Sequence, residues 1–224
     1  MLPPFFCKSI MIKLTQRLQC VAGLVEECDS FLDIGTDHAY LPAFLIESGV
    51  AKRAIASDIN PNPLLNAEKT LAGEELSDKI ELRLSDGFEN IKPGEATEIA
   101  VAGMGGIVIA EMLEKTEWLR DAKYHLVLQP MTHFYDVRKA LSKYGFEILE
   151  EKAVEEGKRV YLVISARFTG KTEEKDEGWY YFGSLLNSEN EADKKYIKKV
   201  VSSLKKKYNG SGDKSAGEAL KCLK

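Results

Sequence analysis

The chain has 224 residues, of which 44% are hydrophobic, and its formal net charge is −4. This length supports one sizeable core with an appendage, and the overall charge does not indicate a nucleic-acid binder. The charge is uneven, however: residues 191–224 carry ten lysines and four acids, whereas residues 1–190 carry 21 basic and 31 acidic residues. A basic C-terminal segment suits either an anionic partner or a solvated helix face, and charge alone does not decide between them.

Cysteine usage and hydropathy exclude several classes of protein. The four cysteines include no C-x-x-C pair and form no metal-like cluster with the three histidines. We therefore expect reduced thiols, a cytoplasmic location and no bound metal. No stretch reaches the roughly 20 apolar residues of a membrane span. Residues 1–10 lack the features of a signal peptide and are interpreted as an extension before the domain. The oligomeric state is open, with a monomer expected.

Apolar spacing predicts the elements in chain order. It indicates an amphipathic helix over residues 13–28, after which strands and helices alternate. The expected strands are 31–34, 53–58, 80–85, 98–102 and 124–128, and the expected helices are 38–48, 63–72, a segment reaching about 119, and 133–144. Two extended runs, 146–154 and 159–168, then form an antiparallel hairpin. This order predicts an α/β fold with a mostly parallel sheet and one antiparallel strand, as in the Rossmann-like class I methyltransferase sheet.

The last quarter of the chain has a different character. Residues 169–177 are charged and nearly free of apolar side chains, which is typical of a linker. Within residues 178–224, Tyr196, Val200 and Leu204 recur at helical spacing among lysines. We therefore predict a catalytic domain over residues 1–168 and a small, lysine-rich helical appendage over residues 178–224.

The segment DIGTDHAYLP, residues 33–42, follows the first expected strand. An acid two places before a glycine at a strand-to-helix turn indicates a nucleotide-type cofactor. A dinucleotide fingerprint would place glycines where this chain has Asp37 and Tyr40, so a pyrophosphate would meet a carboxylate and a bulky ring. S-adenosyl-L-methionine has no phosphate and carries two positive groups, which suits acidic residues. A plain N-cap role for Thr36 or Asp37 is the alternative.

Three acids are expected to meet at one edge of the sheet, because the carboxyl ends of parallel strands lie together. Asp33 can hold its turn or bind the cofactor's amine, and Gly35 permits close backbone approach. Asp58 is 23 residues after Gly35 and suits the ribose hydroxyls, with a strand-end cap as the alternative. Asp86, before a glycine, suits the adenine amine, although a plain Asp-Gly turn is nearly as good an explanation.

A glycine turn, Gly103-Met104-Gly105-Gly106, follows the fourth expected strand. Three glycines in four residues indicate a tight turn or a backbone that admits a ligand. Gln129 ends the fifth strand and is expected to line the same mouth. We expect His38 to pack at the start of its helix and not to act as a base, and we interpret His125 and His133 as structural.

With DIGTDHAYLP, SDINPNP, LSDG, AGMGG and LQP in this order, the chain resembles the bacterial tRNA (adenine-22-N1)-methyltransferases over residues 13–168. The resemblance implies a Rossmann-like catalytic domain, a C-terminal helical domain, and methylation of N1 of a tRNA adenine with S-adenosyl-L-methionine. It makes Asp37, beside His38 and Tyr40, the candidate catalytic acid facing the target base. We expect the cofactor to be bound by Asp33, Gly35, Thr36, His38, Asp58, Ile59, Asn60, Asp86, Gly87, Gly103, Met104 and Gly105. We expect the tRNA to be contacted by Tyr40, Gly106, Gln129, Lys13, Arg17, Lys198 and Lys199.

Other functions stay open at this point. A small-molecule methyltransferase would share the cofactor motif but would leave the basic appendage without a role. A dinucleotide-binding oxidoreductase or a non-catalytic module on the same fold is a further alternative, and Asp37 and Tyr40 argue against the former. The chain lacks an N-P-P-Y/F motif after the fourth strand, which weighs against methylation of an exocyclic amine.

Overall fold

The computed structural model describes residues 12–72 and 76–223, so the expected N-terminal extension lies outside the described residues. Its centre is a seven-stranded sheet in the order β3-β2-β1-β4-β5-β7-β6. The strands are β1 Cys28–Ile34, β2 Ala51–Asp58, β3 Ile80–Leu84, β4 Glu98–Gly105, β5 His125–Thr132, β6 Phe146–Glu156 and β7 Arg159–Phe168. The neighbours from β3 to β5 pair in parallel, whereas β7 runs antiparallel to both β5 and β6. The predicted fold class is confirmed.

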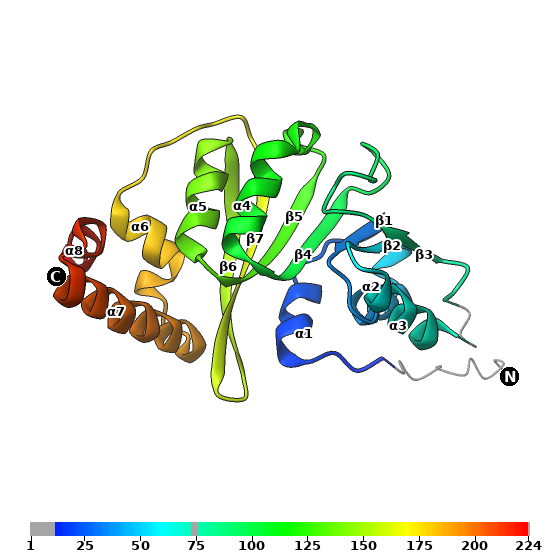
Figure 1. Ribbon diagram of the computed structural model, residues 1–224, viewed down its shortest axis with the longest axis horizontal. Helices are drawn as coiled ribbons and strands as arrows, with labels where there is room; N and C mark the ends of the chain where they lie inside the picture. Colours follow the sequence, from blue (N-terminus) through cyan, green and yellow to red (C-terminus); the bar gives the residue numbers. More distant parts are fainter. Residues whose placement is uncertain (1–11, 73–75, 224) are drawn as a thin grey trace, which may run out of the picture.

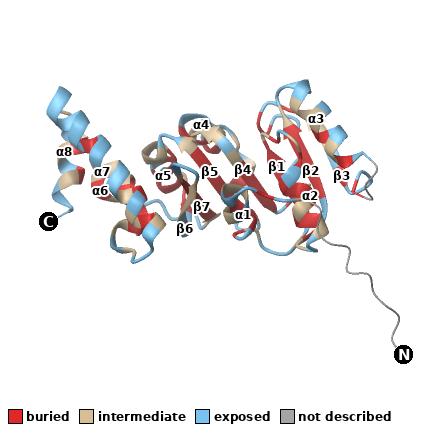
Figure 2. Cartoon of the chain, turned by 90° about the horizontal axis from the view of Figure 1, so that it is seen from below, coloured by how far each residue is buried: buried red, intermediate tan, exposed pale blue. Residues whose placement is uncertain are grey.

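Helices cover both faces of this sheet (Figure 1). One face carries α1 Gln16–Ala22, α2 Tyr40–Glu47 and α3 Pro61–Leu71, and the other carries α4 Gly106–Lys115 and α5 Phe134–Lys143. Neighbouring residues of a strand therefore enter different cores, so that Phe31 packs on the first face and Leu32 on the second. Figure 2 shows the central strands as buried between these layers. Burial on both faces explains why the strands are nearly continuous apolar runs.

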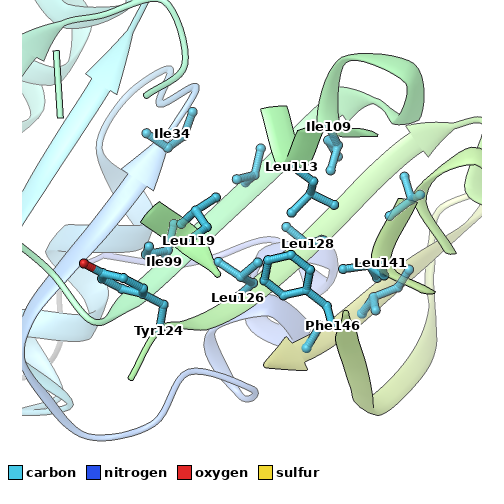
Figure 3. Packing of buried hydrophobic residues seen from close by; sticks show 14 of the residues in the cluster. Ile34, Ile99, Ile109, Leu113, Leu119, Tyr124, Leu126, Leu128, Leu141 and Phe146 are labelled. Carbon is cyan, nitrogen blue, oxygen red and sulfur yellow. The ribbon is translucent and has the colours of Figure 1, made fainter. Parts of the chain in front are cut away.

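The larger core lies under α4 and α5. Leu126 and Leu128 of β5 pack with Ile109 and Leu113 of α4, and Phe146 closes the cluster (Figure 3). Each of these five side chains is no more than 3% exposed. Burying an aliphatic or aromatic side chain of this size contributes about 1.5–3 kcal/mol, so this layer fixes the strands whose ends form the site.

Several predicted helix boundaries were wrong. The first helix stops at Ala22 instead of residue 28, with Gly23 as its C-cap. The second begins at Tyr40 and not at residue 38, because Ala39 adopts a left-handed conformation with φ of 52°. The helix after β4 ends at Lys115 and is followed by a separate 3-10 turn, η1 Glu117–Leu119. A 3-10 turn places residues i and i+3 on the same side, as an α-helix nearly does, so the apolar spacing does not distinguish the two.

The C-terminal region consists of α6 Glu177–Phe182, η2 Gly183–Asn187, α7 Glu191–Ser211 and α8 Lys214–Lys221. These helices lie at the end of the sheet beyond α5 (Figure 1). None of the helices in the described residues is long and apolar enough to cross a membrane.

A buried ion pair joins this region to the sheet. The Nε atom of Arg138, on α5, donates to Glu151 Oε1, on β6, at 2.7 Å, and neither side chain is exposed. The Nη1 atom of Arg138 also donates to the carbonyl oxygens of Tyr180 and Tyr181 on α6, at 3.2 and 3.0 Å, and to the hydroxyl of Tyr196 on α7, at 3.4 Å. The guanidinium group therefore fixes α6 and α7 relative to α5 and the sheet.

Candidate functional site

The topology of the sheet creates a crevice at the carboxyl ends of β1 and β4. From β1 the chain proceeds outward through β2 and β3, whereas β4 lies on the other side of β1 and is followed by β5. Such a switch point is the usual ligand site of an open α/β sheet. Asp33 lies near the end of β1, Asp58 ends β2 and Asp86 follows β3, with Asp58 paired to Leu84 in the ladder. The structure therefore brings the three predicted acids to one edge.

Asp33 is the buried acid of this group, with an exposed fraction of 6%. Burial raises the pKa of Asp33 from 3.8 to about 6, although a hydrogen bond with the Thr36 side chain and the charge of Arg17 oppose the shift. The nearby Asp58 carboxylate adds to the increase. A cationic ligand group beside this buried carboxyl group would favour its ionised form.

The turn after β1 is tight and strained. Gly35 has a φ of +82°, and a Cβ atom built there would lie 2.3 Å from Met104 Cε. The Gly35 and Thr36 amides both donate to the Ser57 carbonyl oxygen, at 2.8 and 2.9 Å. Left-handed conformations at residues other than glycine, such as that of Ala39, are costly and occur preferentially at functional sites.

Neither Thr36 nor Asp37 is the N-cap of α2, because that position belongs to Ala39. The Thr36 hydroxyl oxygen instead accepts a hydrogen bond from the Ala39 amide at 3.1 Å, within the turn. This leaves the exposed Asp37 carboxylate without a capping role. A capping role therefore explains Thr36, which accepts a hydrogen bond from the amide three residues on, but it does not explain Asp37.

Asp37, His38 and Tyr40 lie together on the rim of the crevice. Asp37 Oδ2 is 3.6 Å from His38 Nε2, and the Asp37 side chain is 75% exposed. The His38 and Tyr40 rings are stacked, with centroids 5.0 Å apart and planes 6° from parallel. A planar base can stack on these rings while its amine donates a hydrogen bond to the exposed Asp37 carboxylate.

The outer part of the crevice lies at the ends of β2 and β3. One oxygen of Asp58 accepts from the Asn60 amide at 2.7 Å, so this acid does act as a strand-end cap, and its second oxygen has no partner among the described residues. Ile59 beside it is 56% exposed. A hollow of 770 Å³ is lined by Asp86 and Gly87 on one side and by residues of α4 and η1 on the other. An exposed apolar side chain next to an acid suits a nucleoside, which has an apolar ring face and polar edges.

The glycine turn is held by a contact that the sequence did not predict. Gly103 has a φ of +81°, and its amide donates to Gln129 Oε1 at 3.1 Å. Arg17 Nη1 donates to the same oxygen at 2.6 Å, and Gln129 is fully buried. Gln129 and Arg17 therefore hold the glycine turn in place, and their contact with the tRNA stays a prediction. No sequence signal links two residues 112 positions apart.

Gly106 is explained by packing. A Cβ atom at this position would lie 2.4 Å from the carbonyl oxygens of both Thr132 and His133. These two residues form the turn between β5 and α5, so the glycine turn and the β5–α5 turn are in direct contact. His133 is the N-cap of α5 and has a φ of 54°.

The predicted phosphate contacts divide into two groups. Lys13, Lys198 and Lys199 are exposed, whereas Arg17 is half-buried at the crevice. On α7, Lys194 pairs with Glu189 and Glu191, and Lys195 pairs with Glu155. Within residues 12–72 and 76–223, the α7 lysines that have no acidic partner within 4.0 Å are Lys198, Lys199, Lys205, Lys206 and Lys207.

His125 lies away from the crevice, at the amino end of β5. Its Nδ1 is 2.7 Å from Glu98 Oε2 and its Nε2 is 2.7 Å from Ser165 Oγ, and all three side chains are buried. Glu98 Oε2 also accepts from the Glu26 amide at 3.0 Å. This network satisfies buried polar groups at the bottom of the sheet, which agrees with a structural role for His125.

Comparison with known proteins places the chain in a family. Residues 14–164 match a family model described as a methyltransferase domain. The tRNA (adenine(22)-N(1))-methyltransferase of Bacillus subtilis (strain 168) is 39% identical over 155 residues, which cover 69% of this chain and 65% of that protein. This match therefore spans slightly less than two thirds of the relative's length.

Two solved structures extend the similarity to nearly the whole chain. The crystal structure of the B. subtilis M1A22 tRNA methyltransferase TrmK matches with a TM-score of 0.81 and 30% identity, covering 95% of this chain and 96% of that one. The structure of Streptococcus pneumoniae Sp1610 in complex with S-adenosyl-L-methionine matches with a TM-score of 0.82 and 28% identity, covering 95% and 100%. The chain therefore belongs to the methyltransferase-domain family and, within it, to the TrmK-like tRNA (adenine-22-N1)-methyltransferases.

Proposed function

We propose that this protein transfers the methyl group of S-adenosyl-L-methionine to N1 of adenine 22 in tRNA. The observation that carries the proposal is the meeting of Asp33, Asp58 and Asp86 at the switch point of the sheet, with Asp33 buried there. Asp37 and Tyr40 occupy the positions where a dinucleotide site needs glycines. The similar S. pneumoniae protein binds this cofactor in its crystal.

Each acid of the crevice has a distinct role toward the cofactor. Asp33 would bind the amine at the centre, Asp58 would accept hydrogen bonds from the ribose hydroxyls with its free oxygen, and Asp86 would accept from the adenine amine. The exposed Ile59 would cover the adenine face. The cofactor supplies an electrophilic methyl group on a sulfonium ion, so the chain's task is to align this group with the target nitrogen.

The rim residues would act on the target base. Adenine N1 has a free lone pair once the base has left its stack, and methylation joins N1 to the methyl carbon as the sulfur–methyl bond breaks. The stacked His38 and Tyr40 rings provide a flat surface for the base. Asp37 would accept a hydrogen bond from the exocyclic amine, stabilise the positive charge that develops on the ring, and then take its proton.

Transfer of labelled methyl groups to bulk tRNA, followed by mapping of the modified nucleotide, tests this function. We expect the label at N1 of adenine 22. Asp37→Ala should keep the cofactor Kd within a few fold and abolish methylation, because the exposed Asp37 carboxylate faces the base and not the buried cation site. Equal loss of cofactor binding and methylation would instead place Asp37 in the cofactor site. Label in small molecules but not in tRNA would favour the small-molecule alternative.

A further inference from the structure

A second cavity lies between α5 and α7, outside the cofactor crevice. It has a volume of 420 Å³, within the range of about 300–1,000 Å³ that is typical of small-ligand sites. Its walls include the aromatic side chains of Phe134, Tyr135 and Tyr181 and the lysines Lys199 and Lys207. None of the predicted cofactor residues lines it. Its chemistry therefore calls for a separate ligand with both an apolar surface and negative charge.

The cavity lies next to the turn that contacts the glycine turn of the crevice. Thr132 and His133 form part of its wall, and the carbonyl oxygens of the same two residues contact Gly106 of the glycine turn. The β5–α5 turn therefore contacts the glycine turn and also forms part of the cavity wall. A chain-like substrate that runs past this turn would be able to reach both the crevice and the cavity.

The walls match the parts of a nucleotide. The Tyr135 and Tyr181 rings are fixed against each other, with centroids 4.7 Å apart, and stacking of a base on aromatic side chains contributes about 1–3 kcal/mol. Lys199 and Lys207 are eight residues apart on α7, and Lys207 has no acidic partner among the described residues. Asp136 also lines the cavity, where it repels a free anion but can accept a hydrogen bond from the exocyclic amine of a base.

The cavity is also preorganised. Arg138 binds Glu151 on β6 and contacts the Tyr196 hydroxyl on α7, so the two helices that form the walls are held together in the free protein. A site that exists before binding avoids the entropic cost of ordering its walls.

We propose that this cavity binds an unpaired nucleotide of the tRNA adjacent to the target adenine, an inference that rests on the proposed tRNA methylation. The base stacks against the aromatic wall and donates its amine proton to Asp136, while Lys199 and Lys207 contact the flanking phosphates. Binding there selects RNA in which both the target adenine and its neighbour have left the stack, which adds specificity beyond the recognition of the target base.

Filling the cavity tests the proposal. Ser203 lines it and is exposed, so Ser203→Trp puts an indole ring into the space that the base needs. Ser202→Trp is the matched control, because Ser202 is exposed on the same helix but does not line the cavity. We expect Ser203→Trp to raise the KM for tRNA at least tenfold while the cofactor Kd and the Tm stay at wild-type values. Ser202→Trp should change the KM less than twofold.

A charge-matched pair gives an independent measurement. Lys199→Ala with Lys207→Ala removes the two lysines of the cavity, and Lys205→Ala with Lys206→Ala removes the same charge from α7 outside its walls. The first pair should weaken tRNA binding at least fivefold more than the second. A tRNA with an abasic site next to the target adenine should make wild type and Ser203→Trp indistinguishable.

The outcomes separate this inference from the proposed function. If wild type methylates tRNA and both cavity variants equal their controls, the cavity does not bind a nucleotide and the proposed function stands. If wild type does not methylate tRNA, both proposals are overturned. A Ser203→Trp protein with a lowered Tm leaves the decision to the lysine pairs, whose side chains are exposed.

Discussion

The raised pKa of Asp33 couples cofactor binding, stability and pH in a way that one substitution can test. Burial holds the pKa of folded Asp33 at about 6 instead of 3.8, so the folded chain binds this proton more tightly than the unfolded chain does. Protonation of Asp33 therefore contributes fully to the free energy of unfolding below about pH 4, and this contribution is lost as the pH rises through 6. At 1.36 kcal/mol per pKa unit, the loss amounts to about 3 kcal/mol at neutral pH.

Asp33→Asn removes the energetic cost of burying an ionised carboxylate, and it also removes the negative charge that is proposed to bind the cofactor. We expect the free energy of unfolding of this variant to exceed that of wild type by about 3 kcal/mol at pH 7. This difference should be lost at pH 4. Urea unfolding at both pH values measures the difference. Asp86→Asn is the matched control, because Asp86 is an exposed acid at the same edge of the sheet.

Cofactor binding should show the opposite pH dependence. A cationic ligand binds the ionised form of Asp33, so its Kd in wild type should rise about tenfold from pH 7 to pH 5, as the ionised fraction falls from about 90% to about 10%. Isothermal titration calorimetry with S-adenosyl-L-methionine measures this, and Asp33→Asn should bind weakly with no such dependence. A constant wild-type Kd over this range, or an Asp33→Asn protein less stable than wild type at pH 7, would refute the reasoning.

Two further substitutions test the packing around the site. Gly106→Ala places a Cβ atom 2.4 Å from two backbone oxygens that cannot easily move, so it should lower the free energy of unfolding by about 1–3 kcal/mol. Gly105→Ala is the control: its Cβ atom would have its nearest contact at 3.8 Å, so this substitution should be neutral or stabilising. Equal effects of the two would contradict the close approach. Arg138→Met leaves the buried Glu151 with hydrogen bonds from Ser184 but without a positive partner, and should cost about 3–5 kcal/mol in urea unfolding. Arg138→Met with Glu151→Leu should recover most of this loss. A single variant as stable as wild type would show that the pair does not hold the C-terminal helices.

The sequence predicted the sheet and the position of its acids because both depend on local patterns. A buried strand such as 98–102 is apolar on both faces, and Asp33, Asp58 and Asp86 are placed by the ends of their own strands. Once the strands are parallel, their carboxyl ends meet at one edge, so local spacing was sufficient to bring the three acids together. The start of α2 was missed because Ala39 has no intrinsic preference for the left-handed conformation that the fold imposes on it.

Tertiary structure decided everything that depends on residues far apart in the chain. The sequence predicts Arg17 to be a surface cation in an amphipathic helix. Only the packing of α1 against β5 brings it to Gln129. Likewise, the raised pKa of Asp33 follows from its burial, and the cavity is formed where α7 packs beside α5. Residue types and periodicity describe what each segment can do alone, whereas burial, ion pairing and enclosed volume arise only when segments are packed together.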